Sequence, residues 1–596
     1  MTKAIQLGFL GALGMLLAAS LSSPAAKKKP AVPAAFAKFH NLPSGPMLFL
    51  ASDEGRAFLR ATGHPLANAA IRAFGEPADG TVIPSAWLAA HAAVQSAPAA
   101  APDAVACAGN FGARFNLEPR PNAVPQNQPS GDFLLNRLGA NRDLVVEVAN
   151  DWRGNLAPPV VWDQSVSGYY VHRSTTPDCS TQFEGGLPSF NFQGNVEMGI
   201  GNIVVAADPA RDTFYAADTR FGSASTGGIA LFKATASTLM NTSLCPNGTH
   251  VSAQATSCWG ATPPVLLFAQ SVVGSVGDQP RLAVDERASG TGAGNVYVVS
   301  NSYNFNTQVN TVGLVACSSA LQCSSAVAIS GSYLTAAFPY VHVRADGMIL
   351  VSMITTNTDG SATVLFVNCA AGGAPNAPVC QPPVAIEQIM HPVVPNFNLV
   401  ALVNIDLLAF TYPKLATRAE NGGGFTTFLV YDDCKNPFSF GNPPIVSCLD
   451  SEVLMTTSAD GGGTWSVPAS IDTSSGHHFY PSIYTDSSTA TVNLAYYTTQ
   501  GDKYNHEVRV VRNQIAPGGT ALGSPLTVTK ALDPIDGDPQ QLGSFQSDAF
   551  LGIIARGTGV KGQSHLYTSF DSTSVAGTYE GPPDPEQNNH VSRVVY

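Results

Sequence analysis

Charged side chains are scarce in this 596-residue sequence, and basic ones are the scarcer kind. Only 12% of the residues are Asp, Glu, Lys or Arg, and the formal net charge is −12. Beyond the "KKK" of residues 27–29 there is no Lys/Arg-rich stripe. Because nucleic-acid-binding surfaces are strongly basic, this composition predicts that nucleic acid is not a partner.

Long hydrophobic runs are missing after the N-terminus. Lys3, the apolar run 5–19 and the small residues of "ASLSSPAA" have the layout of a secretory signal peptide. We expect residues 1–26 to be this signal, with cleavage between Ser20 and Ala26; an uncleaved N-terminal anchor is the alternative. Without a second apolar run, the expected product is a soluble, secreted or periplasmic protein with no membrane span after signal removal.

Cysteine spacings typical of zinc sites are also absent. None of the ten cysteines forms Cys-x-x-Cys, and no His cluster accompanies them, so no metal and no cofactor are expected. Eight cysteines instead form pairs that are close in sequence, with separations that suit disulfides in hairpins and loops. The expected bonds, which indicate an oxidising compartment, are Cys245–Cys258, Cys317–Cys323, Cys369–Cys380 and Cys434–Cys448. Cys107 and Cys179 are left and could pair over long range.

Residues 27–130 differ in composition from the rest of the chain. They are rich in Ala and Pro, with helix-like stretches at "DEGRAFLRATG" and "PLANAAIRAF" and a linker-like "SAPAAAPDA". We predict a short, partly helical N-terminal region, for which a pro-segment is one possibility. Residues 131–596, with many β-branched and aromatic runs, are predicted to form one β-domain.

A repeat runs through this domain. Its unit is a polar or Pro-containing start, an apolar strand ending near Asp, a turn, and a second strand rich in Val, Tyr and Ala. Three units align well, "QPRLAVDERASGTGAGNVYVVSNS", "FPYVHVRADGMILVSMITT" and "YPSIYTDSSTATVNLAYYTT", beginning at Gln279, Phe338 and Tyr480. Looser units begin at Asn141, Asn202, Phe397 and Asp538.

One such unit cannot bury both faces of its sheet, whereas sheets arranged radially bury each against the next. The sequence therefore predicts an all-β fold, a β-propeller of six or seven blades. Seven unit starts favour seven blades. Tandem Ig-like sandwiches, the main alternative, would have a Cys…Trp…Cys spacing that is absent here.

The stretch "SADGGGTWS", residues 458–466, predicts a rigid hairpin turn. Three glycines permit positive φ, Asp460 can accept hydrogen bonds from the turn amides, and Trp465 is a large apolar anchor. The series Ser458, Asp460, Gly462, Thr464 and Trp465 resembles the Asp-box of the sialidase-like β-propellers, S-x-D-x-G-x-T-W. A degenerate copy has Thr176, Asp178 and Phe183, and "SFDST" at 569–573 is a weaker match. A ligand site at Asp460 is the alternative interpretation.

This resemblance implies a set of candidate catalytic residues. Sialidases use three arginines for the substrate carboxylate, a Tyr paired with a Glu as nucleophile, and an Asp as acid/base. On the resemblance, Arg153 matches a triad arginine, Asp163 the acid/base and Tyr480 the nucleophile, and Arg281 lies at the start of a repeat. Alternatively, Arg153 is a salt-bridge partner, Asp163 is solvent-exposed and Tyr480 belongs to the core.

The sequence also departs from the sialidase pattern. No Phe-Arg-Ile-Pro motif precedes the first strand, and no second and third arginine can be assigned, although Arg281 and Arg556 lie near starts of repeats. Three hypotheses follow. The protein is a propeller that binds glycans or another extracellular ligand without sialidase chemistry, or an exo-glycosidase with a rearranged site, or a protein-binding scaffold. The oligomeric state is not predicted.

Overall fold

A computed structural model gives the fold. The structure describes 52–61, 67, 71, 75–83, 113–116 and 126–595, with gaps at 141, 152–164, 174–181, 223–225, 251, 272–274, 305–306, 308, 358–360, 373–374, 390–399, 403–406, 410, 436, 441–444, 449–450, 501–506, 529–532, 535–551, 561–562 and 578–583.

Seven strands form a closed ring, each in contact with the next and the last with the first. In ring order they are β2 (Gln126–Gly139), β7 (Asn195–Asp208), β12 (Ser275–Val284), β16 (Ala336–Val343), β23 (Lys414–Ala419), β29 (His478–Asp486) and β34 (Gly552–Arg556). Each is the inner strand of its own antiparallel sheet among the described residues. Sheets that radiate from a ring of inner strands are the blades of a β-propeller, so the predicted six- or seven-bladed propeller fold is confirmed.

The other strands complete the blades outward. The blade of β2 adds β3 (Arg142–Asp151), β4 (Ser167–His172) and β5 (Phe183–Gly186); the blade of β7 adds β8 (Thr213–Gly222), β9 (Thr226–Thr235) and β11 (Val265–Ser271), with β6 (Phe190–Phe192) beside β7; and the blade of β12 adds β13 (Val296–Asn304), β14 (Val309–Cys317) and β15 (Val327–Ala328). The blade of β16 adds β17 (Ile349–Thr356), β18 (Ala362–Ala370), β19 (Val379–Cys380) and β20 (Val384–Ile389), and the blade of β23 adds β24 (Phe425–Cys434), β27 (Ser451–Ser458) and β28 (Ala469–Ser470). The blade of β29 adds β30 (Thr491–Thr498), β31 (Glu507–Ile515), β32 (Leu526–Thr527) and β33 (Asp533–Pro534), and the blade of β34 adds β35 (His565–Gly577), β36 (Asp584–Val595) and β1 (Ala113–Asn116). A further small sheet contains β21 (Val400–Leu402), β22 (Leu407–Ala409), β25 (Pro437–Phe440) and β26 (Ile445–Cys448).

Burial explains why these strands read as apolar runs. Strand β8 is buried along its whole length, and β3 is buried everywhere except at its first residue. Alternation of polar and apolar residues is lost because each blade is covered on both faces by its neighbours. Hydrophobic clusters accordingly span adjacent blades, as where Val351 of β17 and Val312 of β14 share one cluster.

The ring is closed by strands from both ends of the propeller sequence. Strand β1 pairs antiparallel with β36, so the last blade contains residues that precede the predicted domain boundary at 131. Buried polar contacts add to this closure. The carboxylate of Asp143, on β3, lies 2.5 Å from His565 Nδ1 and accepts a hydrogen bond of 2.9 Å from the Tyr567 hydroxyl, both on β35. Side chains therefore join the first blade to the last, and β1 pairs within the sheet of the last blade.

The Pro-containing starts of the repeats correspond to a bulge in the inner strand. The backbone is left-handed at four of the repeat starts, with φ values of 54° at Asn202, 51° at Gln279, 54° at Phe338 and 51° at Tyr480. A register shift accompanies each of them. Proline follows three of the four, and it suits the position because a bulge leaves a backbone N–H without a partner in the ladder. The "QP", "FP" and "YP" pairs are thus the sequence signature of this bulge.

Disulfides lie where the spacing predicts them. Cys245–Cys258, Cys317–Cys323 and Cys369–Cys380 are bonded, which confirms three of the expected pairs. Cys434 is disulfide-bonded as well. The side chain of Cys448 lies outside the described residues, as do Cys107 and Cys179.

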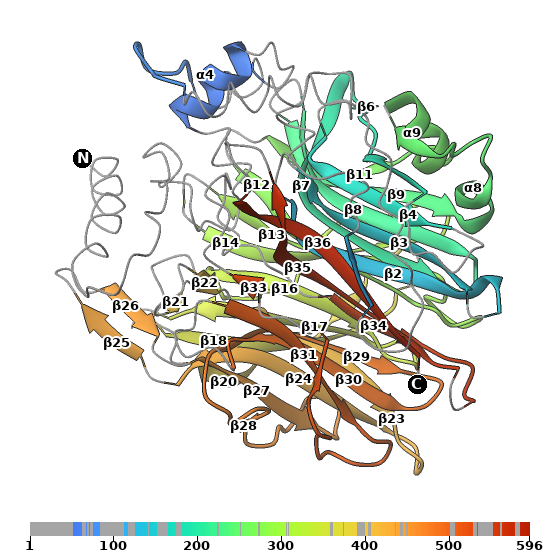
Figure 1. The fold of residues 1–596 in the computed structure, drawn as a ribbon, viewed down its shortest axis with the longest axis vertical. Helices are drawn as coiled ribbons and strands as arrows, with labels where there is room; N and C mark the ends of the chain where they lie inside the picture. Colours follow the sequence, from blue (N-terminus) through green and yellow to red (C-terminus); the bar gives the residue numbers. More distant parts are fainter. Residues whose placement is uncertain are drawn as a thin grey trace.

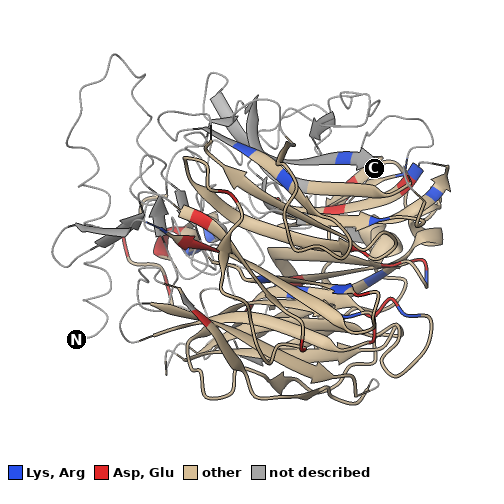
Figure 2. Ribbon diagram, turned by 90° about the horizontal axis from the view of Figure 1, so that it is seen from below, with Lys and Arg blue, Asp and Glu red and all other residues tan. Residues whose placement is uncertain are grey.

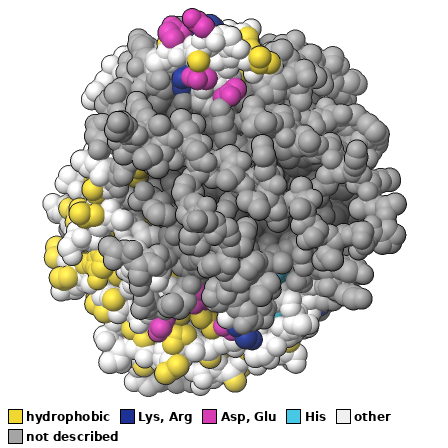
Figure 3. Space-filling model, turned by 90° about the vertical axis from the view of Figure 1, so that its left-hand side faces the viewer, with side chains coloured by type: hydrophobic (Ala, Val, Ile, Leu, Met, Phe, Trp, Pro, Cys, Tyr) yellow, Lys and Arg dark blue, Asp and Glu magenta, His cyan; other side chains and the backbone are white. Residues whose placement is uncertain are grey.

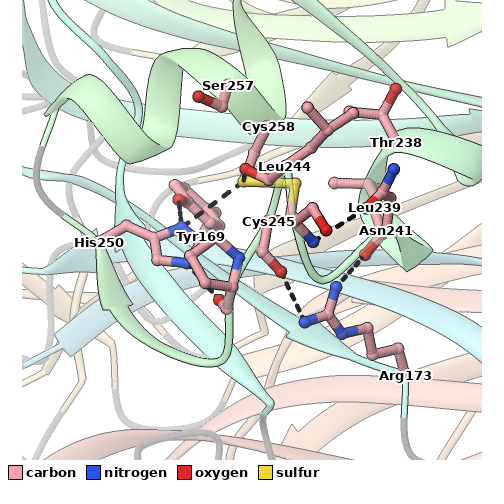
Figure 4. The surroundings of a disulfide bond; sticks show 12 residues. Tyr169, Arg173, Thr238, Leu239, Asn241, Leu244, Cys245, His250, Ser257 and Cys258 are labelled. Carbon is pink, nitrogen blue, oxygen red and sulfur yellow. Dashed lines mark hydrogen bonds between the residues drawn. A yellow bond between two sulfur atoms is a disulfide. The ribbon is translucent and has the colours of Figure 1, made fainter.

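The first of these disulfides closes an excursion between β9 and β11 that reaches the neighbouring blade. The excursion contains α8 (Ala236–Met240) and α9 (Ser252–Trp259), which are labelled in Figure 1, and β10 (Gly248–His250), which pairs in parallel with β5. Arg173 holds it from the neighbouring blade, donating hydrogen bonds of 2.6 Å to the carbonyls of Leu239 and Cys245 (Figure 4). The Nδ1 atom of His250 accepts a 2.7 Å hydrogen bond from the buried Tyr169 hydroxyl. Burial lowers the pKa of His250, which favours the neutral ring that this hydrogen bond requires.

The N-terminal region contributes α4 (Asp53–Ala61), within the stretch predicted to be helical. Acidic residues Asp53 and Glu54 occupy its first turn and Arg60 its last, which complements the helix dipole. The helix lies apart from the blades in Figure 1, and acidic side chains gather at the corresponding end of the molecule in Figure 3. None of the helices in the described part of the chain is long and apolar enough to cross a membrane.

Candidate functional site

The bulges define a layer of residues round the axis of the ring. At one bulge in each of β2, β7, β12, β16 and β29, the register with the next strand shifts, and one residue is the first to pair again after it. These residues are Ser130, Val204, Arg281, Tyr340 and Ser482. Lys414 follows the same pattern, since it comes after Tyr412-Pro413 and is the first paired residue of β23. We call these six residues the bulge layer; they occupy equivalent positions on six inner strands.

Large polar side chains occupy only one side of this layer. Arg281, Tyr340 and Lys414 lie on β12, β16 and β23, which are consecutive in the ring. The other three members are two serines and a valine. We call Arg281, Tyr340 and Lys414 the cationic arc. This asymmetry gives the axis a cationic side and a side of small residues at the same level.

Aromatic packing fixes the cationic arc in place. The Arg281 guanidinium lies 5.3 Å from the centroid of the Tyr412 ring, and its Nη1 donates a 2.8 Å hydrogen bond to the carbonyl of Pro280. Tyr412 is 1% exposed and meets the ring of Phe338 edge-on at 4.6 Å. A cation held over a buried tyrosine ring is both stabilised and restricted in direction. Arg281 is therefore tied to the segment that carries Lys414.

Electrostatics distinguish the three members of the arc. Lys414 is 7% exposed, and its pKa is lowered to about 7 by burial and by the positive charge of Arg281, with Asp432 acting in the opposite direction. Burial raises the pKa of the half-buried Tyr340 to about 12, and Arg281 opposes that rise. Near neutral pH the arc thus offers a permanent cation, a phenol that keeps its proton and an amine close to its titration point.

A second polar group contains Arg556, at the end of β34, and Glu286, which follows β12, together with Asp132 of β2 and Tyr484 of β29. We call these four residues the turn-end cluster. Arg556 contacts the Asp132 carboxylate at 3.1 Å, and its Nη1 lies 2.8 Å from both Glu286 oxygens. Arg556 ends β34, and Glu286 follows β12. Because β2 and β7 lie between these two strands in the ring, this ion pair crosses the axis. Figure 2 shows that basic and acidic residues lie close together on the right-hand side of the molecule in that view.

Burial sets the protonation behaviour of the turn-end cluster. It raises the pKa of Asp132, although Arg556 and the backbone amides of Ala207 and Phe133, at 2.7 and 2.6 Å, stabilise the carboxylate. The two carboxylates in turn raise the pKa of Arg556. Burial and the nearby Glu286 raise the pKa of Tyr484 above its ordinary value, with Arg556 acting against them. Tyr484 is accordingly a protonated phenol, the form that donates a hydrogen bond and is a poor nucleophile.

The residues suggested by the sequence have different positions. Arg281 belongs to the bulge layer. Tyr480 occupies the left-handed position before Pro481, is 2% exposed, and packs edge-on against Phe479 at 5.7 Å within the core cluster that also contains Tyr412. Arg153 and Asp163 lie outside the described residues, so the structure does not place the four together.

Of the degenerate Asp-box copy, only Phe183 lies among the described residues; Thr176 and Asp178 do not. Phe183 is buried, stacks on the His250 ring at 5.0 Å and lies beneath the Arg173 guanidinium at 4.5 Å. These ring contacts are made with the excursion described above, and Phe183 also belongs to the core cluster that contains Leu134 and Ile203 of two inner strands.

Sequence reasoning missed Tyr340 and Lys414. The signal was present in the repeats, because both residues directly follow the proline in "FPY" and "YPK", as Arg281 does in "QPR". Aligning the repeats on that proline, rather than on the strands after it, would have brought the three together.

The turn at 458–466 joins β27 to β28, the outer strands of its blade. Asp460 accepts hydrogen bonds from Thr464 N at 2.9 Å, Thr464 Oγ1 at 2.7 Å and Ser458 Oγ at 2.8 Å, and these lower the pKa of its carboxyl. Gly462, with φ of 97°, faces Phe366 of β18 so closely that a Cβ would meet its ring at 2.1 Å. Trp465 packs edge-on against the same ring at 5.2 Å. The turn thus docks one blade on its neighbour.

Replacing Trp465 with Ala is expected to lower the free energy of unfolding by about 1–3 kcal/mol, because the anchor between two blades is lost. Asp460→Ala should act in the same direction, since three hydrogen bonds disappear. Denaturant unfolding of both variants tests this, with Val467→Ala, at an 88% exposed position two residues on, as the unaffected control. A Trp465 variant with parental stability and no ligand binding would show instead that the turn is a ligand site.

Comparison with known proteins places the chain near no characterised family by sequence. No family model matches it, and no curated protein matches it significantly. Solved structures that are similar include the Hadza microbial sialidase Hz136, 10% identical over 82% of this chain and 98% of that one, with a TM-score of 0.38. AofleA from Arthrobotrys oligospora is 11% identical over 70% and 90%, with a TM-score of 0.34. A protein of unknown function from Dyadobacter fermentans is 10% identical over 65% and 92%, with a TM-score of 0.35.

Proposed function

We propose that this protein is an exported β-propeller that binds a carboxylate-bearing glycan, or another anionic extracellular ligand, at its bulge layer without sialidase chemistry. The observation that carries the proposal is the cationic arc, in which Arg281 and the buried Lys414 share one side of the axis. Arginine forms charge-assisted and bidentate hydrogen bonds with carboxylates.

Stability alone is a poor reason for this arrangement. Burying a lysine beside an arginine disfavours the charged form of the lysine, and here the consequence is the lowered pKa of Lys414. A bound anion would relieve that repulsion, and clusters with such perturbed groups are concentrated at functional sites. Ser130, Val204 and Ser482, the other members of the bulge layer among the described residues, have smaller side chains.

Several observations argue against sialidase-type hydrolysis. The bulge layer supplies one arginine and one lysine where the sialidase pattern uses three arginines. Tyr480 is buried in the core, and Tyr484 has a raised pKa, whereas a nucleophilic tyrosine must give up its proton.

One observation favours the alternative, an exo-glycosidase with a rearranged site. Tyr484, Glu286, Asp132 and Arg556 come from four separate blades and interact near the axis. Tyrosine, carboxylates and arginine are the residue types of sialidase catalysis.

Measuring binding and hydrolysis in parallel separates these functions. We expect the purified protein to bind acidic sugars on a glycan array, less tightly as salt is raised, and to leave a fluorogenic sialoside intact. Hydrolysis that disappears in Tyr484→Phe would establish the glycosidase instead. No binding to any sugar, acidic or neutral, would contradict the proposal and favour the protein-binding scaffold.

A further inference from the structure

We propose that Lys414 is a reactive amine that forms an imine with the carbonyl group of a 2-oxo acid while Arg281 holds the adjacent carboxylate. This inference rests on the proposed function, that is, on binding of an anionic ligand at the bulge layer. It adds a covalent step and a narrower ligand class, a carboxylate attached directly to a ketone.

The position of Lys414 is fixed by its neighbours. It is the first paired residue of β23, and the carbonyl of the preceding Pro413 accepts a 2.5 Å hydrogen bond from Ser352 of the adjacent blade. Two residues before it, Tyr412 is clamped between Phe338 and Arg281. A lysine whose backbone is held on both sides presents its amine from a defined place in the layer.

The surroundings of the amine favour its neutral form. Lys414 is 7% exposed, and the charged groups that act on its pKa include Arg281 from β12 and Asp432 from β24 of its own blade. Burial and the like charge of Arg281 both disfavour the ammonium form, and Asp432 offsets only part of this. Desolvation and a neighbouring cation are the means by which lysine is activated as a nucleophile toward carbonyl compounds.

The ligand class follows from the two neighbouring functions. A guanidinium binds a carboxylate, and a neutral amine attacks a carbonyl carbon. Arg281 and Lys414 lie at the same level on strands separated in the ring only by β16. A 2-oxo acid carries both groups on adjacent carbons, so one small molecule can engage both side chains.

Tyr340, which lies between the two in the ring, completes the chemistry. The Lys414 nitrogen forms a bond to the ketone carbon and loses a proton; the oxygen then leaves as water, and a C=N bond replaces C=O. The departing oxygen requires a second proton, and Tyr340, whose pKa is raised to about 12, is a phenol that retains one to donate. The remaining proton of the nitrogen then returns to the Tyr340 oxygen. Amine and ketone thus give imine and water, with no other reactant.

Reductive trapping tests the imine directly. The full-length protein would be incubated with pyruvate and sodium cyanoborohydride near neutral pH, and the modified lysines identified by peptide mapping. We expect Lys414 to be alkylated more than about tenfold faster than Lys233, because the neutral fraction of its amine is far larger. Lys233 is a matched internal control, since it is also partly buried and its Nζ donates a 2.6 Å hydrogen bond to the Ser319 carbonyl. Acetone, which lacks a carboxylate, should label Lys414 slowly.

Variants separate this inference from the proposed function. Arg281→Ala should lose the preference for pyruvate over acetone, and Lys414→Arg, which keeps a cation at this position, should lose the label. If Lys414→Arg does not fold, peptide mapping of the parent identifies the labelled lysine, and its protection by a saturating acidic sugar would show that the label and the sugar share the bulge layer. An unlabelled Lys414 in a protein that binds acidic sugars would overturn the imine and leave the proposed function standing. Equal labelling by acetone and pyruvate would overturn the role of Arg281.

Discussion

Replacing Arg556 with Met is expected to lower the free energy of unfolding by about 3–5 kcal/mol, because a buried carboxylate loses its cation. Asp132 is 4% exposed and would keep only its two backbone donors, and Glu286 would lose both contacts across the axis. Denaturant unfolding measures the loss. It should be smaller at acidic pH, where protonation of Asp132 removes the unpaired charge, since burial already raises the pKa of this group.

Arg344→Met is the matched control. Arg344 also lies at the end of an inner strand and pairs with an aspartate, but Asp346 is 42% exposed on its side chain, so the expected loss is within about 1 kcal/mol. Adding Asp132→Asn to the Arg556 variant should restore part of the stability, since no charge is then buried. An Arg556 variant as stable as the control would mean that the cross-axis ion pair contributes little.

Replacing Lys414 with Met is expected to change how stability depends on pH. The folded pKa of Lys414 is lowered to about 7, whereas a lysine in the unfolded chain titrates near 10.4. Between these values the unfolded chain holds one proton more than the folded protein. The free energy of unfolding of the parent should therefore rise with pH, relative to the variant, by about 1.4 kcal/mol per pH unit.

Below about pH 7 both states of the parent hold the proton, so the difference between parent and variant should become constant. Measuring both proteins side by side removes the contribution of all other titrating groups, provided they are unaffected by the substitution. Parallel stability curves from about pH 6 to pH 9 would show that Lys414 remains charged in the folded protein. That outcome would also remove the chemical basis for the imine.

Much of the fold is determined by features that can be read locally. The proline at the start of several repeats, the apolar run after it and the glycine-rich turn at 458–466 all appear in the structure as parts of a blade. A strand buried on both faces must be apolar throughout, and this requirement leaves a clear pattern in the sequence. Disulfides within hairpins are similarly local, which is why three expected pairs could be confirmed.

The candidate site was less predictable because it depends on which blades are adjacent. Arg281 was singled out for its place at the start of a repeat, but its partner Lys414 is 133 positions away in the sequence. The contacts of Arg556 with Asp132 and Glu286 span 424 and 270 residues, and no periodic pattern in the sequence signals them. Tyr480, by contrast, was chosen by resemblance; its left-handed backbone and buried ring follow from the bulge, which composition alone does not reveal.

The central claim is that the cationic arc binds an anionic ligand, and calorimetry of Arg281→Ala tests it most directly. Parent and variant would be titrated with an acidic sugar and with a neutral one, with Arg344→Ala as the control for loss of an arginine elsewhere. We predict that Arg281→Ala loses more than about 1.5 kcal/mol of binding free energy for the acidic sugar, since a charge-assisted hydrogen bond is removed. Binding of the neutral sugar, and both titrations of the control, should match the parent. An Arg281→Ala variant that binds the acidic sugar as tightly as the parent would contradict the account.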